Sequence, residues 1–240
     1  MAFFEHDFSV RMRDVDANTK ITNKAILGFF EDIGGLHSDK VGYGFNDIYA
    51  TRLSWILLHW KIKVIKRAIY GDVIHIKTWS RYSTKFYSYR DFEMYSKNGE
   101  LLVIGTSKWA LLNIDSGLAR LEESLISKYK PEQKSVFDEL EVKKLKEPKT
   151  FSNCNEYKVL RSNIDINKHM HNLYYLDVAN EVIPDDIYES EEFNNVEIMY
   201  KTGAMLGETL KSFYSNVEDE HFVTIKSEDE QTLHAIVRMY

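Results

Sequence analysis

Asp165-Ile166-Asn167-Lys168-His169 is the stretch that decides how this sequence is organised, because its frame of polar residues occurs twice. The earlier copy, Asp16-Ala17-Asn18-Thr19-Lys20, keeps the aspartate and the asparagine but has a lysine where the later copy has a histidine. In both copies a further asparagine follows three residues later, and a helical pattern of apolar residues comes next. We therefore interpret the chain as a duplicated unit in which only the second copy carries an imidazole.

A second pair of frames supports the duplication. The segment Lys66-Arg67-Ala68-Ile69-Tyr70-Gly71-Asp72 recurs loosely at 201–208, where it ends in Gly207-Glu208. The chain therefore contains the same two loop frames, in the same order, in both of its halves.

The first half contains a helical pattern followed by strand patterns. Apolar residues at helical spacing run from Ala25 to Ile33, and Gly34-Gly35 is expected to end that helix. Alternating strand patterns follow from Leu53, and Lys97-Asn98-Gly99-Glu100 is typical of a hairpin turn. These residues predict one helix packed on antiparallel strands.

The second half repeats this order. A leucine stripe that stops at Pro184 predicts a helix, and strands are expected near 195–201, 208–216, 220–227 and 231–239. One helix wrapped by an antiparallel sheet, twice over, predicts an α+β fold of the tandem double hot-dog kind. We expect an N-terminal half at 1–125, a linker at 126–152 and a C-terminal half at 153–240.

Composition excludes several classes of function. The 240 residues carry a net charge of −6, which argues against a general nucleic-acid binder because such proteins present a basic face. The single cysteine, Cys154, rules out an internal disulfide, and the N-terminus lacks the regions of a signal peptide. No apolar run is long enough to cross a membrane. We expect a cytoplasmic protein that binds neither nucleic acid nor membrane.

Motifs for common cofactors and nucleophiles are missing from the sequence. No spacing of histidine, cysteine and aspartate matches a metal site. The chain also has neither a phosphate-cradling glycine loop nor a Gly-x-Ser-x-Gly elbow. The sequence therefore predicts neither a bound metal nor another cofactor.

Two long segments resemble the acyl-acyl carrier protein thioesterases, a family with plant plastid and bacterial members. The first runs from Leu53 through Gly71-Asp72 to Trp79, and the second runs from Asp165 to Tyr175. The resemblance covers nearly the whole chain, with the motifs in the right order. It implies hydrolysis of the thioester that joins a fatty acyl chain to the phosphopantetheine arm of acyl carrier protein.

The resemblance also implies which residues do the chemistry. The family places catalysis on an aspartate, an asparagine and a histidine, which match Asp165, Asn167 and His169. A glutamate that the family carries in a tyrosine-basic-basic-glutamate frame is replaced here by Gly203. A cysteine that follows it in plant members is replaced by Ala204. The supporting acid is therefore absent from its family position.

The three residue types suit thioester hydrolysis. A histidine moves protons near neutral pH, an amide orients water or a carbonyl, and Asp165 can serve as nucleophile, as base or as the partner of the imidazole. Alternate positions place the three side chains on one face of an extended backbone, just before helix amides that suit an oxyanion. An aspartate and an asparagine before a helix are also typical of a loop held only by Asx turns. The sequence leaves this alternative, and the role of Asp165, open.

Apolar and basic side chains are candidates for binding the substrate. An acyl chain needs an apolar slot, and plain core packing is the alternative role for the same residues. The slot candidates are Ile26, Phe29, Phe30, Ile33, Trp55 and Leu57. Acyl carrier protein is acidic, so a basic cluster is expected to dock it, with a solvated face as the alternative. That cluster consists of Lys61, Lys63, Lys66 and Arg67.

Two other functions fit the same residues. One is a thioesterase that acts on acyl-coenzyme A, and the other is a non-catalytic protein that binds acyl chains or their carrier. The second alternative follows from Gly203, which leaves the family's glutamate position without an acid. The sequence does not fix the preferred chain length, branching or saturation, and it leaves open whether the chain forms a homodimer.

The duplication predicts one active site per chain. Lys20 holds the position that His169 occupies in the second copy, and a lysine is a poor base at neutral pH unless its surroundings favour the neutral amine. Lys20→Ala is therefore expected to leave the rate of thioester hydrolysis close to that of the unchanged protein, measured as free thiol released. A collapse of turnover in a variant that stays folded contradicts this division of labour.

Overall fold

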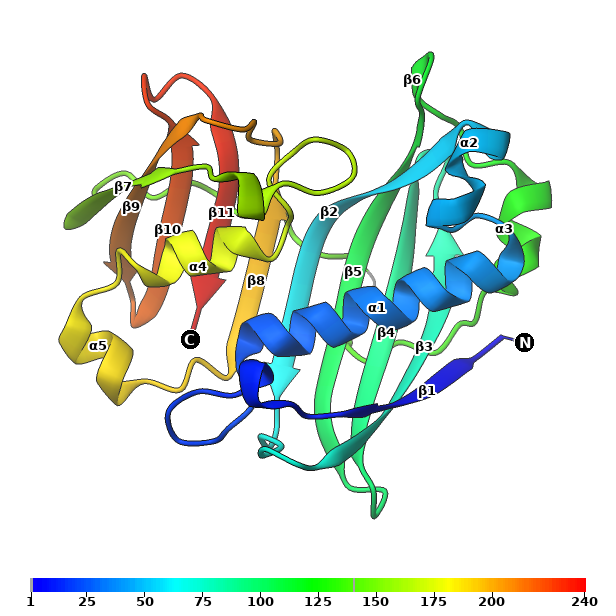
Figure 1. Ribbon diagram of the computed structural model, residues 1–240, viewed down its shortest axis with the longest axis horizontal. Coiled ribbons are helices and arrows are strands. Elements are labelled where there is room, and N and C mark those ends of the chain that lie inside the picture. The colour runs from blue at the N-terminus through cyan, green and yellow to red at the C-terminus, as the bar shows by residue number, and fades with distance from the viewer. Residues whose placement is uncertain (1, 140) are drawn as a thin grey trace. The chain divides into compact units, whose positions relative to one another are not determined.

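The computed structural model describes residues 2–139 and 141–240. Contacts divide the chain into an N-terminal unit, Met1–Val142, and a C-terminal unit, Lys143–Tyr240. Each unit has an antiparallel sheet with a helix lying across one face (Figure 1). The division falls inside the segment 126–152 that the sequence predicts as a linker.

The sheet of the N-terminal unit has the strand order β1-β3-β4-β5-β2, with every neighbouring pair antiparallel and β6 added to β5. Its strands are β1 (Phe4–Ser9), β2 (Leu53–Val64), β3 (Val73–Ser83), β4 (Tyr87–Ser96), β5 (Leu101–Asn113) and β6 (Gly117–Leu118). Its helices are α1 (Asn23–Val41), α2 (Ile48–Thr51) and α3 (Glu123–Tyr129), with short 3₁₀ turns at Met12–Asp14 and Phe45–Asp47.

Helix α1 begins and ends at well-formed caps. The side chain of Thr22 accepts the backbone N–H of Ala25, and Gly42 ends the helix in the left-handed region at φ 81°. The expectation that Gly34-Gly35 ends this helix is wrong, because α1 continues to Val41. Gly34 is instead buried, and a Cβ there would lie 3.6 Å from Cδ of Arg90. Packing on the sheet thus outweighs the low helix propensity of glycine.

The ring of Phe30 fixes how closely α1 lies on the sheet. It stacks on Phe92 of β4 with 4.6 Å between ring centroids. A Cβ added at Gly105 of β5 would lie only 2.6 Å from Phe30 Cε2, so this position admits no side chain without movement. Burial of these apolar groups supplies most of the stability of the helix.

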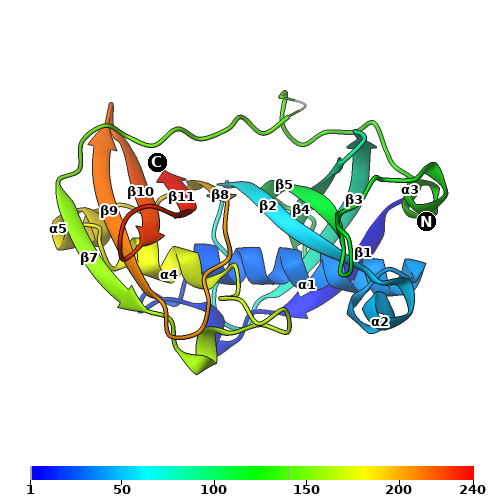
Figure 2. The same cartoon turned by 90° about the horizontal axis from the view of Figure 1, so that it is seen from above.

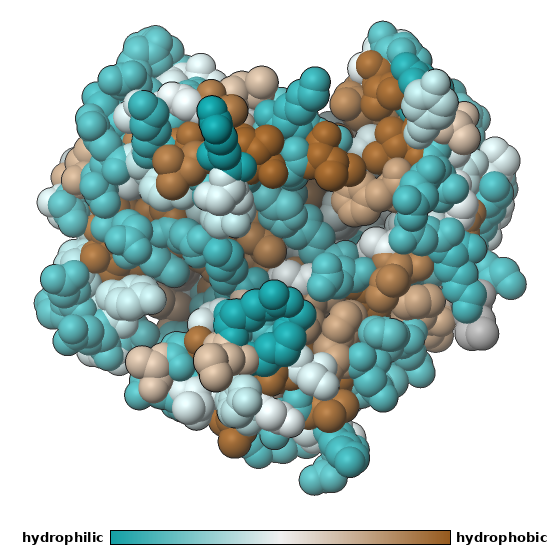
Figure 3. Space-filling model, viewed as in Figure 1, coloured by the Kyte–Doolittle hydropathy of each residue, from teal (hydrophilic) through white to brown (hydrophobic). Residues whose placement is uncertain are grey.

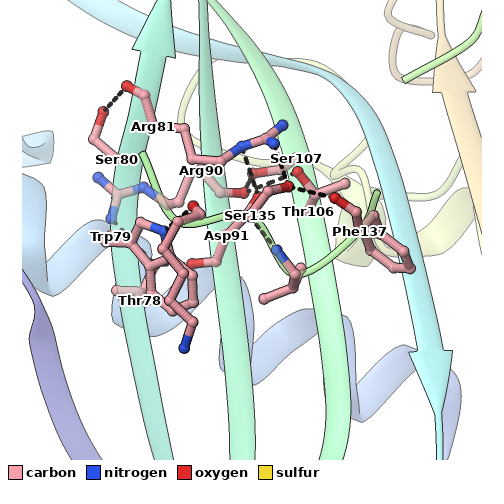
Figure 4. Close-up of polar contacts among 12 residues, drawn as sticks. Thr78, Trp79, Ser80, Arg81, Arg90, Asp91, Thr106, Ser107, Ser135 and Phe137 are labelled. Atoms are coloured by element: carbon pink, nitrogen blue, oxygen red, sulfur yellow. Dashed lines mark hydrogen bonds and ion pairs between the residues drawn. The ribbon is translucent and has the colours of Figure 1, made fainter. Parts of the chain in front are cut away.

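The face of the N-terminal sheet opposite α1 is covered by the segment 132–137 (Figure 2). Trp79 Nε1 donates to the carbonyl of Lys134 at 2.9 Å, and the backbone N–H of Val136 donates to Asp91 Oδ2 at 2.9 Å. Asp91 also pairs with Arg81 at 3.1 Å, and both side chains are almost fully buried (Figure 4). This ion pair therefore ties β3, β4 and the covering segment together.

The sheet of the C-terminal unit has the strand order β8-β11-β10-β9-β7, again antiparallel throughout. Its strands are β7 (Asn153–Lys158), β8 (Asn195–Tyr200), β9 (Thr209–Val217), β10 (Glu220–Ser227) and β11 (Leu233–Met239). Its helices are α4 (Tyr174–Asn180) and α5 (Asp185–Ser190), with a 3₁₀ turn at Arg161–Asn163. The helix predicted before Pro184 is present as α4 but ends at Asn180, and Pro184 directly precedes α5.

The surface viewed in Figure 3 is mostly hydrophilic, with hydrophobic residues in smaller groups between the polar ones. Among the described residues, no helix combines the length and the apolarity that a membrane span needs.

The buried pair of Arg81 and Asp91 leads to a prediction on stability. Asp91→Ala leaves the guanidinium of Arg81 buried without its carboxylate and frees the covering segment at Val136, so it is expected to cost about 3 kcal/mol of unfolding free energy. Asp115→Ala, which breaks the exposed ion pair of Asp115 with Arg52, serves as the matched control and is expected to change stability little. Urea denaturation of both variants measures the difference. Equal effects contradict a structural role for the buried pair.

Candidate active site

The segment from Asp165 to His169 is a tight loop closed by its own first residue. The backbone N–H of Asp165 donates to the carbonyl of His169 at 2.8 Å. Oδ1 of Asp165 accepts the backbone N–H groups of Asn167 at 2.8 Å and of His169 at 3.2 Å. Lys168 adopts a left-handed φ of 64°. The extended backbone expected from the alternating side chains is therefore wrong, and the Asx-turn geometry given as the alternative is present.

The loop presents its side chains to different degrees. Asn167 and His169 are exposed, while Asp165 is partly buried. One oxygen of Asp165 is already occupied by two backbone donors, so this carboxylate holds the loop that carries His169. A side chain held in this way can still use its second oxygen for chemistry.

The first copy has the same loop geometry. Asp16 N–H donates to the carbonyl of Lys20 at 2.9 Å, and Asp16 Oδ1 accepts the N–H groups of Asn18 and Lys20, both at 2.9 Å. Thr19 adopts a φ of 63°, which matches that of Lys168. The duplication of the first frame is thus confirmed at the level of individual hydrogen bonds. The last position of the loop differs between the copies: it is Lys20 in the first and His169 in the second.

In each unit the second repeated segment, 66–72 or 201–208, pairs with the aspartate loop, 16–20 or 165–169. Lys20 forms an isolated β-bridge with Ile69, and His169 forms one with Met205. The side chains of Asp72 and Glu208 close the second frames, because each accepts a backbone N–H three residues earlier in the chain, at 2.9 and 2.8 Å. The loosely similar segments recognised in the sequence therefore occupy corresponding places in the two units.

Gly203 lies directly beneath the ring of His169. A Cβ added at Gly203 would meet Cδ2 of His169 at 2.7 Å, Cγ at 3.0 Å and Cβ at 3.3 Å. The imidazole therefore occupies the space into which any side chain at 203 would extend. The absence of a side chain at 203 and the placement of the imidazole are physically linked.

Tyr175 supports the segment under His169 from helix α4. Its buried hydroxyl accepts the backbone N–H of Ala204 at 2.9 Å, and the carbonyl of Ala204 accepts the N–H of Met170 at 2.8 Å. The pKa of Tyr175 is raised to about 12, chiefly by burial; the Ala204 bond opposes the rise and the charges of Glu208 and Asp165 add to it. Tyr175 is therefore a neutral phenol that ties α4 to the floor of the loop.

A pair formed by the buried imidazole of His234 and the half-buried carboxylate of Glu208 holds the same floor from the sheet. His234 Nδ1 donates to the carbonyl of Thr202 at 2.8 Å, and His234 Nε2 lies 3.1 Å from Glu208 Oε1. The other carboxylate oxygen of Glu208 accepts the N–H of Met205. The segment 202–205 is therefore fixed on both sides of Gly203. The sequence analysis missed His234, which occupies an ordinary strand position and carries no motif.

The amides that were expected to form an oxyanion site at the helix start are partly used by the chain itself. His171 N–H donates to the carbonyl of Asn163 at 2.8 Å, and His171 Nδ1 accepts the N–H of Leu173 at 3.3 Å. The N–H of Tyr174 donates to the carbonyl of His171. These bonds give His171 a local role at the start of α4.

The predicted slot residues belong to the core of the N-terminal unit. Ile26, Phe29, Phe30 and Ile33 of α1 and Leu57 of β2 are buried, while Trp55 is partly buried. Phe29 packs on Phe8 with 5.2 Å between ring centroids, and Trp55 Nε1 donates to the hydroxyl of Tyr129. These contacts are those of core residues, and contact with an acyl chain stays a prediction.

The four predicted docking cations differ in their surroundings. Lys61 lies 3.3 Å from Glu139, and Lys66 lies 2.8 Å from Glu100. Arg67 donates to the carbonyl of Ile21 and to the side chain of Asn23, so it braces the loop of the first copy. Lys63 is exposed. Docking of a carrier protein on this cluster stays a prediction. Within the described ranges, no cluster of three histidine, cysteine or acidic side chains could hold a metal ion.

Two helix-on-sheet units that repeat the same loop define a tandem double hot-dog protein. Residues 2–129 match the family model of the acyl-ACP thioesterase N-terminal domain, and residues 146–238 match that of the acyl-ACP thioesterase C-terminal domain. The chain belongs to the acyl-ACP thioesterase family.

Named relatives are similar to the chain in sequence, and solved structures share its fold. The chain is 25% identical to oleoyl-acyl carrier protein thioesterase 1 of Arabidopsis thaliana over 82% of its own length, and the match spans 59% of that longer relative. An acyl-ACP thioesterase from Bacteroides thetaiotaomicron has a TM-score of 0.88 at 19% identity, covering 99% of this chain and 97% of that one. The 12:0-ACP thioesterase of Umbellularia californica also reaches 0.88, at 20% identity with 100% and 96% covered. The predicted fold is confirmed.

The contact between Gly203 and His169 leads to a prediction on structure. Gly203→Ala is expected to displace the imidazole, because the added Cβ lies too close to three of its atoms, and to cost about 1 kcal/mol of unfolding free energy. The shift of the His169 ring signals in a ¹H–¹³C NMR spectrum measures the displacement. Gly35→Ala is the control, because a Cβ at that helical position meets no atom within 4 Å. Unchanged ring signals in Gly203→Ala contradict the contact.

Proposed function

We propose that this protein hydrolyses fatty acyl-acyl carrier protein thioesters to a free fatty acid and the carrier with its free phosphopantetheine thiol. The observation that carries the proposal is the exposed His169 on a loop fixed by Asp165, Gly203 and the Glu208–His234 pair. Membership of the acyl-ACP thioesterase family supports it, as do relatives named for oleoyl- and palmitoyl-acyl carrier protein. An imidazole held on a fixed loop can take and return a proton, as attack of water on a thioester requires.

In this proposal the three loop residues divide the chemistry. His169 takes a proton from the attacking water and returns one to the departing thiolate, so that a C–O bond forms and the C–S bond breaks. Asn167 orients the water or the carbonyl without changing charge. Asp165 holds the loop through Oδ1, and its remaining oxygen is available to orient the imidazole or the water.

We assign the thioester chemistry to the C-terminal unit and acyl-chain binding to the N-terminal unit. The first assignment is supported by the imidazole, which the loop of Lys20 lacks although it has the same backbone bonds. The second is supported by the buried apolar residues of α1 and β2. The phosphopantetheine-bearing carrier is the proposed partner. Its docking site on the lysine cluster, a homodimer and a cytoplasmic location stay predictions.

A non-catalytic acyl-binding protein is the second candidate. It is favoured by Gly203, because the family's supporting acid is missing at that position. Hydrolysis of an acyl carrier protein thioester under multiple-turnover conditions separates the two candidates. Comparison of the rates on acyl-acyl carrier protein and acyl-coenzyme A then decides which carrier the enzyme prefers.

The site assignment predicts the effect of two substitutions. His169→Ala is expected to lower kcat at least about a hundredfold, the lower range for a positioned acid–base group, and Asn167→Ala is expected to impair it as well. Thiol release from a panel of acyl carrier protein thioesters is the measurement. His171→Ala is the matched control, because His171 bonds locally at the start of α4, and its effect is expected to be mild. Wild-type rates in both folded loop variants remove the assignment.

A further inference from the structure

The side of the N-terminal sheet that faces α1 changes from apolar to polar along its strands. Strand register places the residues of this face in rows. The apolar row contains Ile76, Met94, Val103 and Val64. Four residues further along each strand, the polar row contains Ser80, Arg90 and Ser107, with Trp60 at its end. The row between them, which includes Phe92, lies under Phe30 of α1.

Arg90 is a buried cation without a carboxylate partner. Its side chain contacts His37 Nδ1 at 3.0 Å, Thr78 Oγ1 at 3.3 Å and the ring of Tyr129 at 5.6 Å, all of them uncharged groups. No acidic side chain in the described part of the chain lies within ion-pair distance of Arg90. A guanidinium has five N–H donors, and these bonds use only Nη1.

The protonation states leave the positive charge uncompensated. Burial lowers the pKa of Arg90 to about 10, which still leaves it charged at neutral pH. Burial, together with the charge of Arg90, lowers the pKa of His37 to about 3, so the imidazole is neutral and accepts from the guanidinium. A buried charge without a partner is costly, and titratable groups that burial perturbs cluster at functional sites.

The same sheet contains a direct comparison. Arg81, on the opposite face of β3, is equally buried but pairs with Asp91 at 3.1 Å. Elsewhere in this unit, therefore, a buried guanidinium is neutralised by a carboxylate of the chain itself. On the side of the sheet that faces α1, by contrast, the described residues give Arg90 no carboxylate partner.

We propose that the polar row around Arg90 binds an oxygen carried by the acyl chain of the substrate, so that the enzyme favours acyl groups with a distal hydroxyl or carboxylate. This inference rests on the proposed function, in which the N-terminal unit takes the acyl chain. The oxygen accepts from the guanidinium N–H groups of Arg90 that the bonds to His37 and Thr78 do not use. A carboxylate also neutralises the buried charge, and guanidinium geometry suits it.

The test uses acyl carrier protein loaded with acyl groups of one length that are unsubstituted, ω-hydroxylated or ω-carboxylated. The unchanged protein is expected to have at least about tenfold higher kcat/KM for an oxygenated chain than for the unsubstituted one, a typical value for a charge-assisted hydrogen bond. The hydroxylated and carboxylated arms identify which oxygen is favoured. Preference for the unsubstituted chain overturns the inference.

Arg90→Met removes the charge at similar volume. It is expected to reverse the preference, with a lower kcat/KM on oxygenated chains and a higher one on the unsubstituted chain. Arg120→Met, which removes an exposed arginine of the same unit, is the matched control and is expected to leave the ratio unchanged. An unchanged ratio in folded Arg90→Met overturns the inference. If that variant does not fold, the substrate panel with the unchanged protein decides alone.

Binding of free acids separates this inference from the proposed function. Calorimetry with a monocarboxylic fatty acid and the α,ω-dicarboxylic acid of the same length needs no turnover. If the unchanged protein binds the diacid more tightly and Arg90→Met loses this difference, the inference is supported even when no thioester is hydrolysed. Absence of hydrolysis by itself overturns only the proposed function. Equal binding of the two acids by the unchanged protein overturns the inference.

Discussion

The carboxylate of Asp165 fixes the loop on which the proposed function of this protein depends, because its Oδ1 accepts two backbone N–H groups within the same five-residue turn. Those bonds fix the backbone at Asn167 and His169 from within the turn. The ring of His169 then rests on the bare Cα of Gly203, and Tyr175 and the Glu208–His234 pair fix the segment that contains it. Positioning of the imidazole is thus shared between a local turn and the hydrogen-bonded segment 202–205.

In the proposed function, the two copies of one backbone turn have different roles, structural in the first and chemical in the second. Asp16 makes the same two bonds as Asp165, so the turn survives in both units whether or not its last side chain can move a proton. The second copy differs by an imidazole. A side chain at 203 would extend into the space that its ring fills. Among the described residues, Asp165 and the half-buried Glu208 are acids that hydrogen-bond the loop or its floor.

Interactions between residues that are close in the sequence explain which features could be predicted from the sequence. The two aspartate frames, the hairpin at 97–100 and the helix and strand periods depend on residues only a few positions apart, and the structure contains each of them. The pair Gly34-Gly35 led to a wrong prediction of where the helix ends. Packing on the sheet extends α1 to Val41, and a local sequence pattern contains no information on that packing. Arg90 and His37 are 53 positions apart, and His234 and Glu208 are 26 apart, so neither pair leaves a signature in any short stretch.

One measurement tests most directly whether the imidazole of the second loop is what makes this chain an enzyme. His169→Lys gives the second loop the side chain of the first and leaves the backbone bonds of Asp165 intact. We expect thiol release from an acyl carrier protein thioester to fall at least about a hundredfold, with the melting temperature unchanged. Turnover close to that of the unchanged protein contradicts the claim that His169 moves the proton.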